Sequence, residues 1–121
     1  MREIENIRAW LTRRIRAPFR VTTKREQYWC SDDYAFYTEI DVQHPDDEFV
    51  LAVNVAHDAK QEAFLLRALH YAVPEVWLVD ENARYIVQSR RDRGAVRLRR
   101  DDVLFSAQLP SIRIPLAEIL G

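Results

Sequence analysis

The chain has 121 residues, of which 48% are hydrophobic and 31% charged, and its formal net charge is −1. This length and balance predict a single soluble globular domain over residues 1–121, with a core that needs no disulfide or metal cross-link. No apolar run approaches the roughly 20 residues of a membrane helix, and residues 1–17 lack the apolar region of a signal peptide, so we expect a cytoplasmic protein without a membrane partner. The single cysteine, Cys30, excludes a disulfide framework and a cysteine-rich zinc site.

Charge is distributed unevenly along the chain. Residues 1–30 carry eight basic and three acidic side chains (+5), residues 31–66 carry one and nine (−8), and residues 67–121 carry nine and seven (+2). Lysine is scarce, because 16 of the 18 basic residues are arginine and only Lys24 and Lys60 remain. The near-zero sum therefore does not exclude nucleic acid as a partner, since separate basic segments persist.

The first predicted elements are a helix and two short extended stretches. Apolar residues recur at helical spacing over residues 4–15, and Pro18 ends the helix because a proline pushes the preceding residue out of helical geometry. Residues 19–23 and 27–30 are β-branched or aromatic, which predicts one strand or a bent pair.

Two longer strands are predicted next. Residues 34–42 alternate with period two, which predicts one strand with Glu39 and Asp41 on the same face. Residues 49–56 are nearly all apolar, as in a central strand covered on both faces, and Asn54 is the only polar residue among them.

The second half of the chain predicts a helix, a strand, a hairpin and a short final helix. Asp58 is placed to cap a helix that runs to about residue 71. Residues 76–79 indicate a short buried strand, and residues 84–91 and 95–100 flank a glycine turn, which predicts a hairpin. Residues 116–120 form the last helix in this prediction.

This order predicts the fold class. Hairpin-like strands followed by a strand–helix–strand unit imply a mixed sheet flanked by helices, an α/β fold. The order α-β-β-β-α-β, followed by a C-terminal hairpin, is that of the restriction-endonuclease core.

Two passages resemble a known family. Residues 73–80 read V-P-E-V-W-L-V-D, similar to the V-P-E-Y-W-x-V-D signature of the Uma-two family of predicted restriction endonucleases. Residues 109–120, L-P-S-I-R-I-P-L-A-E-I-L, resemble that family's closing L-P-G-L-x-L-x-L-A-E-L-F. The resemblance spans most of the chain, although residues 1–60 agree only in pattern. It implies a PD-(D/E)XK nuclease, in which acids on two core strands hold Mg²⁺ and a lysine orients the attacking water.

The positions that match the family's catalytic residues are only partly retained. Asp41 matches the first metal-binding aspartate, although Ile40 replaces the preceding proline. Asn54 stands where the resemblance implies a metal-binding glutamate, and Phe64 stands in the place of the lysine. Asparagine can ligate through its carbonyl oxygen but brings no charge to a hard cation.

Other residues are candidates to rebuild the site. A rearranged nuclease would use Asp41, Asn54 and Lys60 in catalysis, with Asp41, Glu39 and Asp58 as the Mg²⁺ ligands. His57 is a further candidate metal ligand or general base. The alternative interpretations are a helix cap for Asp58, a solvated Lys60, and an exposed strand face for the two acids near residue 40.

The predicted hairpin is rich in arginine. Its arginines are candidates to contact nucleic-acid phosphates, and Arg90, Arg91, Arg97 and Arg99 are the ones we select. The alternative is a solvated edge whose charges discourage pairing between sheets.

Three functions therefore remain open. The first is an inactive or diverged restriction-endonuclease-like protein that binds nucleic acid or regulates and needs no cofactor. The second is a Mg²⁺-dependent endodeoxyribonuclease with a rearranged site and DNA as its substrate. The third is a structural protein that forms a homodimer through its sheet or hairpin. Asn54 and Phe64 place the first above the second.

Overall fold

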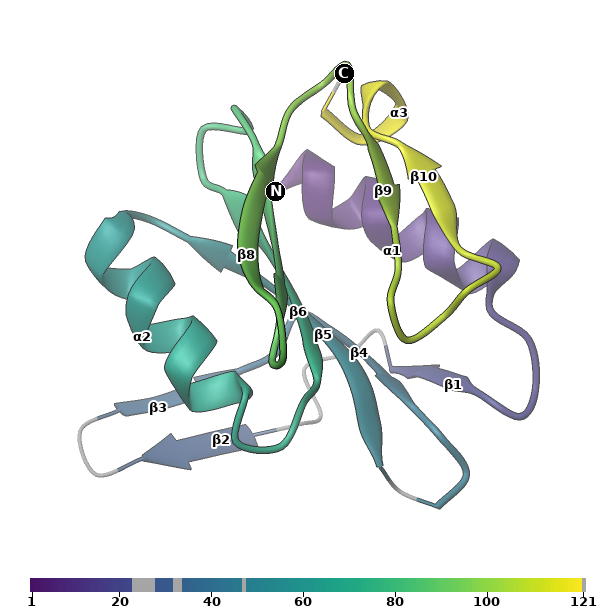
Figure 1. The fold of residues 1–121 in the computed structure, drawn as a ribbon, viewed down its shortest axis with the longest axis horizontal. Helices are drawn as coiled ribbons and strands as arrows, with labels where there is room; N and C mark the ends of the chain where they lie inside the picture. Colours follow the sequence, from purple (N-terminus) through teal and green to yellow (C-terminus); the bar gives the residue numbers. More distant parts are fainter. Residues whose placement is uncertain (23–27, 32–33, 47, 121) are drawn as a thin grey trace.

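A six-stranded mixed sheet forms the centre of the computed structural model, which describes residues 1–22, 28–31, 34–46 and 48–120 (Figure 1). Its strands lie in the order β1 (Arg20–Thr22), β4 (Ile40–Gln43), β5 (Phe49–Ala56), β6 (Glu75–Asp80), β7 (Ile86–Arg90) and β8 (Gly94–Leu98). Strands β5 and β6 run parallel, and the other neighbours in this sheet are antiparallel. The predicted α/β class with a mixed sheet flanked by helices is confirmed.

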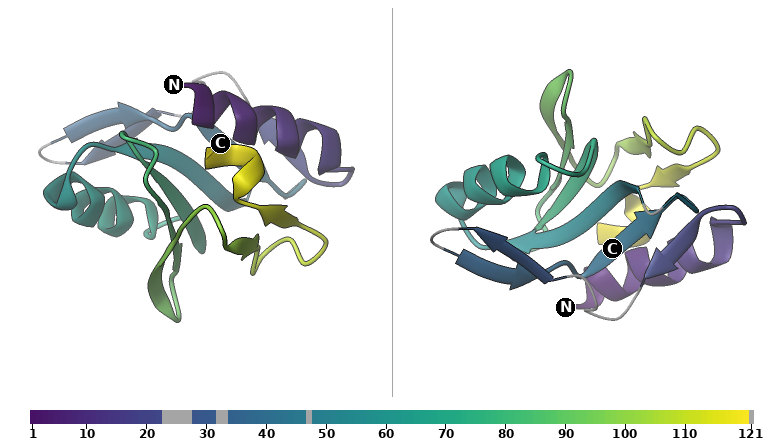
Figure 2. Two further views of the ribbon diagram at one scale, coloured as in Figure 1. Left: turned by 90° about the horizontal axis from the view of Figure 1, so that it is seen from above. Right: turned by 90° about the horizontal axis from the view of Figure 1, so that it is seen from below.

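Helices cover both faces of this sheet (Figure 2). On one face lie α1 (Arg2–Arg14), α3 (Ala117–Leu120) and a small sheet of β9 (Val103–Phe105) and β10 (Arg113–Pro115). On the other lies α2 (Ala59–Leu69). Two hydrophobic cores result, because successive residues of β5 point to opposite faces: Leu51 and Val53 pack into the first core and Ala52 into the second.

The two main helices follow from local sequence. The apolar face of α1, predicted from its spacing, is buried through Ile4, Ile7, Trp10 and Leu11. The predicted cap of α2 is confirmed, because the Asp58 carboxylate accepts a hydrogen bond from the backbone N–H of Gln61 at 2.8 Å. No helix in the described residues is long and apolar enough to cross a membrane.

The prediction of one continuous strand over residues 34–42 is wrong, because the structure has two strands there. The chain bends at Thr38 and Glu39, so that the segment divides into β3 (Tyr34–Tyr37) and β4. Strand β3 pairs with β2 (Tyr28–Ser31) in a separate two-stranded sheet, while β1 pairs with β4. Strand β5 stabilises the bend. The backbone N–H of Glu39 donates hydrogen bonds to two acceptors on β5, the carbonyl oxygen of Val53 and the side-chain oxygen of Asn54.

The C-terminal segments agree in part with the prediction. The β7–β8 hairpin is present, and Gly94 at its turn has φ of +83°, a conformation that glycine adopts without strain. The final helix is α3 (Ala117–Leu120), whereas β9 and β10 are strands that no local pattern predicts. A buried carboxylate, Glu75, holds the connection between these two strands through hydrogen bonds from Ser106 and from the backbone of residues 107 and 108.

Candidate functional site

A pocket of about 600 Å³ opens at the carboxyl end of β5. Helix α1 reaches it from one face of the sheet and α2 from the other, so polar residues distant in sequence meet there. The polar residues lining it are Glu5, Arg8, Glu39, Asn54, His57 and Gln61. The carboxyl ends of parallel strands are a common place for ligand binding in α/β folds.

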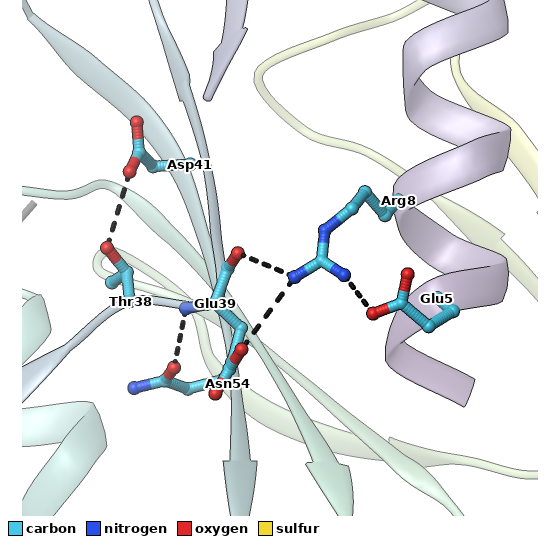
Figure 3. Close-up of polar contacts among 6 residues, drawn as sticks. All are labelled: Glu5, Arg8, Thr38, Glu39, Asp41 and Asn54. Atoms are coloured by element: carbon cyan, nitrogen blue, oxygen red, sulfur yellow. Dashed lines mark hydrogen bonds and ion pairs between the residues drawn. The ribbon is translucent and has the colours of Figure 1, made fainter. Parts of the chain in front are cut away.

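Arg8 is the cationic side chain among the residues that line this pocket, and it lies between Glu5 and Glu39 (Figure 3). One of its terminal nitrogens, Nη2, lies 3.3 Å from the carbonyl oxygen of Glu39 and 3.7 Å from the carboxylate of the same residue. The other, Nη1, pairs with Glu5, and this contact holds the pKa of the Glu5 carboxyl below its usual value. Two carboxylates thus surround one guanidinium, and the amino terminus of Met1, which also lines the pocket, adds a second positive charge near Glu5.

Asn54 is built into the wall of the same pocket. The residue is 5% exposed, and its Oδ1 accepts the backbone N–H of Glu39 at 2.9 Å. A backbone N–H needs an oxygen acceptor, so this bond fixes which end of the amide points inward. The carbonyl oxygen that could have served as a metal ligand is therefore engaged with the chain.

Asp41 lies apart from Glu39, contrary to the prediction that they share a face. Its Oδ2 accepts a hydrogen bond from the Thr38 hydroxyl at 3.3 Å, and the residue is 2% exposed. Figure 3 shows Asp41 and Thr38 on one side of the strand and the Glu39 carboxylate directed toward Arg8. The bend at residues 38 and 39 breaks the alternation on which the prediction depended.

Asp41 does share a face with Asn54. Its partner in the sheet is Ala52, two residues before Asn54. The two side chains therefore stand about 6–7 Å apart along the strand direction.

Asp58 and Lys60 line a second pocket, of about 530 Å³, beside Phe64. This pocket adjoins the first, because His57 and Gln61 line both. The structure thus brings Glu39 together with Asn54, and Asp58 together with Lys60. Among the residues it describes, no three His, Cys, Asp or Glu side chains are grouped closely enough to hold a metal ion.

His57 pairs with a residue that sequence reasoning missed. Its Nδ1 lies 2.6 Å from a carboxylate oxygen of Glu81, at the shared rim of the two pockets. The signal was present in the sequence, since His57 follows β5 and Glu81 follows β6, and the ends of adjacent parallel strands meet. Arg8 was missed as well, and nothing in the sequence distinguishes it from the other arginines of α1.

The arginines of the β7–β8 region gather around one aromatic ring. The guanidinium carbons of Arg84, Arg97 and Arg99 lie 5.6, 4.6 and 5.7 Å from the centre of the Tyr85 ring. We call Tyr85 and these three arginines the Tyr85 cluster. Arg84 is paired with Asp80 at 2.8 Å.

The four arginines selected from the sequence therefore divide into two groups. Arg97 and Arg99 belong to the Tyr85 cluster, and Arg97 also lies 3.9 Å from a Glu62 carboxylate oxygen. Arg90 and Arg91 instead reach backbone carbonyls, those of residues 105 and 70, at 3.5 and 2.8 Å.

Comparison with known proteins identifies the fold. No family model matches this chain, and no curated protein matches it. The structure is similar to that of a candidate nuclease belonging to DUF820 from Anabaena variabilis ATCC 29413, with a TM-score of 0.65. The similarity covers 97% of this chain and 75% of that chain at 12% sequence identity. At that identity the two proteins are shown to share a fold.

Proposed function

We propose that this chain is a restriction-endonuclease-like protein of the Uma-two type that binds nucleic acid in the cytoplasm and does not hydrolyse it. The fold is shared with a candidate nuclease, and the motif at residues 73–80 resembles the Uma-two signature. The pocket at the end of β5 lies where this fold class would place its chemistry, and its residues differ from those of a metal-dependent nuclease.

The position of Arg8 is the observation that carries the proposal. A hard cation such as Mg²⁺ needs anionic oxygen ligands, and in this pocket the Glu39 carboxylate lies 3.7 Å from the Arg8 guanidinium. Asn54, in place of an acid, uses its oxygen to bind the backbone of Glu39. An amide therefore stands where the resemblance places the second metal-binding acid, and the neighbouring Glu39 carboxylate already faces a guanidinium.

The Tyr85 cluster supports nucleic acid as the ligand. Three guanidinium groups around one ring repel one another unless an anion joins them, and two are partly balanced by Asp80 and Glu62. The side chain of Arg99 is exposed and can bind a phosphate through two parallel hydrogen bonds. Binding of this kind weakens as salt rises, because bound phosphates release their counterions.

The proposal is tested by the salt dependence of DNA binding. Fluorescence anisotropy of a labelled oligonucleotide in EDTA measures the affinity of the wild-type protein and of Arg97→Gln and Arg99→Gln. Each substitution should lower the slope of log affinity against log salt by about 1. Arg20→Gln is the matched control, because Arg20 lies in β1 at the opposite edge of the sheet. Equal affinities and slopes in all four proteins would refute the proposed surface.

A second candidate is the Mg²⁺-dependent endonuclease with a rearranged site. The observation in its favour is that Asp58 and Lys60, an acid and an amine, line one pocket. This candidate predicts cleavage of plasmid DNA in Mn²⁺ that disappears in Asp41→Ala and in Lys60→Ala. Intact plasmid after incubation with the folded wild-type protein would reject it.

A further inference from the structure

The two-stranded sheet of β9 and β10 has one buried face and one exposed face (Figure 1). Leu104 and Ile114 lie opposite each other in its register, and both are buried in the first core. Phe105 and Arg113 are the next pair in the register, so they point away from the core, because successive residues of a strand point to opposite faces. Phe105 is 53% exposed, which is unusual for a phenylalanine.

Two arginines lie next to Phe105. The guanidinium carbon of Arg113, on the paired strand, is 5.6 Å from the centre of the Phe105 ring. Arg90, at the end of β7, donates from Nη2 to the carbonyl oxygen of Phe105 at 3.5 Å. Within the described part of the chain, neither arginine forms an ion pair with a carboxylate. Each guanidinium carries five N–H donors, so both retain donors for an anion.

The stretch of chain that carries this face is basic. Residues 90–113 contain seven arginines and three aspartates, which gives a formal charge of +4. The aspartates lie in the two turns that flank β8: Asp92, Asp101 and Asp102. Two carboxylates from outside the segment also approach it, Glu62 beside Arg97 and the buried Glu75, and they lower the sum to +2. The charge that remains favours an anionic partner.

We propose that this face binds one base of a single-stranded nucleic acid, stacked on the Phe105 ring, with Arg90 and Arg113 contacting the neighbouring phosphates. A flat aromatic ring offers a surface that any base can cover, and guanidinium groups bind phosphate oxygens through parallel hydrogen bonds. A duplex fits poorly, because its bases are covered on both faces by their neighbours. A second copy of this chain also fits poorly, since a twofold contact through this face would bring equal charges together. The inference rests on the proposed function, because it names the class of nucleic acid that is bound.

A tight turn connects this face to the Tyr85 cluster. The backbone N–H of Asp102 donates to the carbonyl oxygen of Arg99 at 2.9 Å, and the Asp102 carboxylate accepts the backbone N–H of Arg99 at 2.7 Å. Arg99, which belongs to the cluster, is six residues before Phe105. Their Cα atoms are therefore no more than roughly 22 Å apart, which is within the span of one bound strand of several nucleotides. Proteins that bind single strands combine aromatic stacking and phosphate contacts in this way.

Fluorescence anisotropy with two labelled strands of equal length separates stacking from charge. One strand carries thymine at every position, and the other has the same sugar-phosphate backbone without any base. The wild-type protein should bind the thymine strand about tenfold more tightly than the abasic strand, because only the first can stack on Phe105.

Three variants assign this preference to the ring. Phe105→Leu keeps an apolar side chain at an exposed position and removes the ring, so it should bind both strands with equal affinity. Its slope of log affinity against log salt should match that of the wild type, because no phosphate contact is lost. Phe105→Tyr should keep the tenfold preference. Tyr71→Leu is the matched control and should keep it too, because Tyr71 is 89% exposed just after α2, on the other face of the six-stranded sheet.

A duplex tests the preference for a single strand. When the thymine strand is annealed to its complement, Phe105→Leu and the wild type should bind with equal affinity, because no base face is open to the ring. A loss of duplex affinity in Phe105→Leu as large as the loss for the single strand would overturn the inference.

The remaining outcomes distinguish failure of this inference from failure of the proposed function. Equal binding of the thymine and abasic strands by the wild type, or a thymine preference that Phe105→Leu retains, overturns stacking on Phe105. If Arg97→Gln and Arg99→Gln still lower the salt slope in that case, the proposed function stands. A wild-type protein that binds neither strand overturns both. A smaller mass of Phe105→Leu in light scattering, with unchanged affinity for the thymine strand, assigns the face to a second copy and overturns the inference as well.

Discussion

Replacing Glu75 with glutamine should destabilise the protein far more than a change of one atom suggests. The Glu75 side chain is fully buried, and five hydrogen-bond donors surround its carboxylate. One oxygen, Oε1, accepts from the Ser106 hydroxyl and from the backbone N–H groups of residues 107 and 108 at 2.8–3.0 Å. The other, Oε2, accepts from Trp77 at 2.6 Å and from Gln88 at 3.0 Å.

The expected loss in the free energy of unfolding follows from the number of donors that lose their acceptor. The glutamine oxygen can replace Oε1 and keep three bonds, but the new NH₂ group then faces the N–H donors of Trp77 and Gln88. Two hydrogen bonds to a charged acceptor are lost, and each is worth about 1.5–3 kcal/mol. We therefore expect Glu75→Gln to lower the free energy of unfolding by about 3–6 kcal/mol, and Tm by roughly 12–24 °C for a chain of this size.

Urea denaturation followed by tryptophan fluorescence measures this loss, with thermal unfolding as a second measurement. The matched control is Glu118→Gln, which alters an exposed carboxylate that accepts a single bond from Trp10 at 3.2 Å. The control should lose less than about 1 kcal/mol. A loss of that same small size in Glu75→Gln would refute the reasoning that this carboxylate fixes the β9–β10 connection to the sheet.

Three further predictions concern stability and assembly. Arg84 holds the pKa of the Asp80 carboxyl below its usual value, so Asp80 stabilises the protein above about pH 4, and that stabilisation is lost as pH falls through the lowered native pKa. The difference in unfolding free energy between wild type and Asp80→Asn should accordingly shrink between pH 7 and pH 3, and a constant difference would contradict this. Asp58→Ala should cost about 1 kcal/mol in thermal unfolding through loss of the α2 cap, and Asp58→Asn, which keeps a capping oxygen, should cost less. We also expect a homodimer, because β8 is an exposed edge strand; light scattering should give twice the chain mass of 14.3 kDa, and the chain mass alone would reject it.

The parts of the fold that depend on local patterns could be predicted from the sequence. The apolar face of α1 and the Asp58 cap involve residues no more than a few positions apart, and both are as expected. The buried run of β5 and the glycine turn of the hairpin are equally local. These features, taken in order, were enough to give the α/β class.

The site depended on contacts between distant residues, which a local pattern does not report. The bend at Glu39 is held by Asn54, 15 positions further along the chain, and it separates two acids that alternation alone puts together. Arg8 reaches residue 39 across 31 positions. The β9–β10 sheet likewise depends on Glu75, 31 positions before Ser106.

The central claim is that this chain binds nucleic acid without a metal and leaves it intact. Fluorescence anisotropy of end-labelled DNA, recorded over time in EDTA and then after addition of excess Mn²⁺, tests both parts in one sample. We predict salt-sensitive binding in EDTA and, after the immediate shift that Mn²⁺ causes as a counterion, an anisotropy that stays constant with time. An oligonucleotide that does not bind in EDTA, or a falling anisotropy as Mn²⁺ releases shortened fragments, would contradict the account.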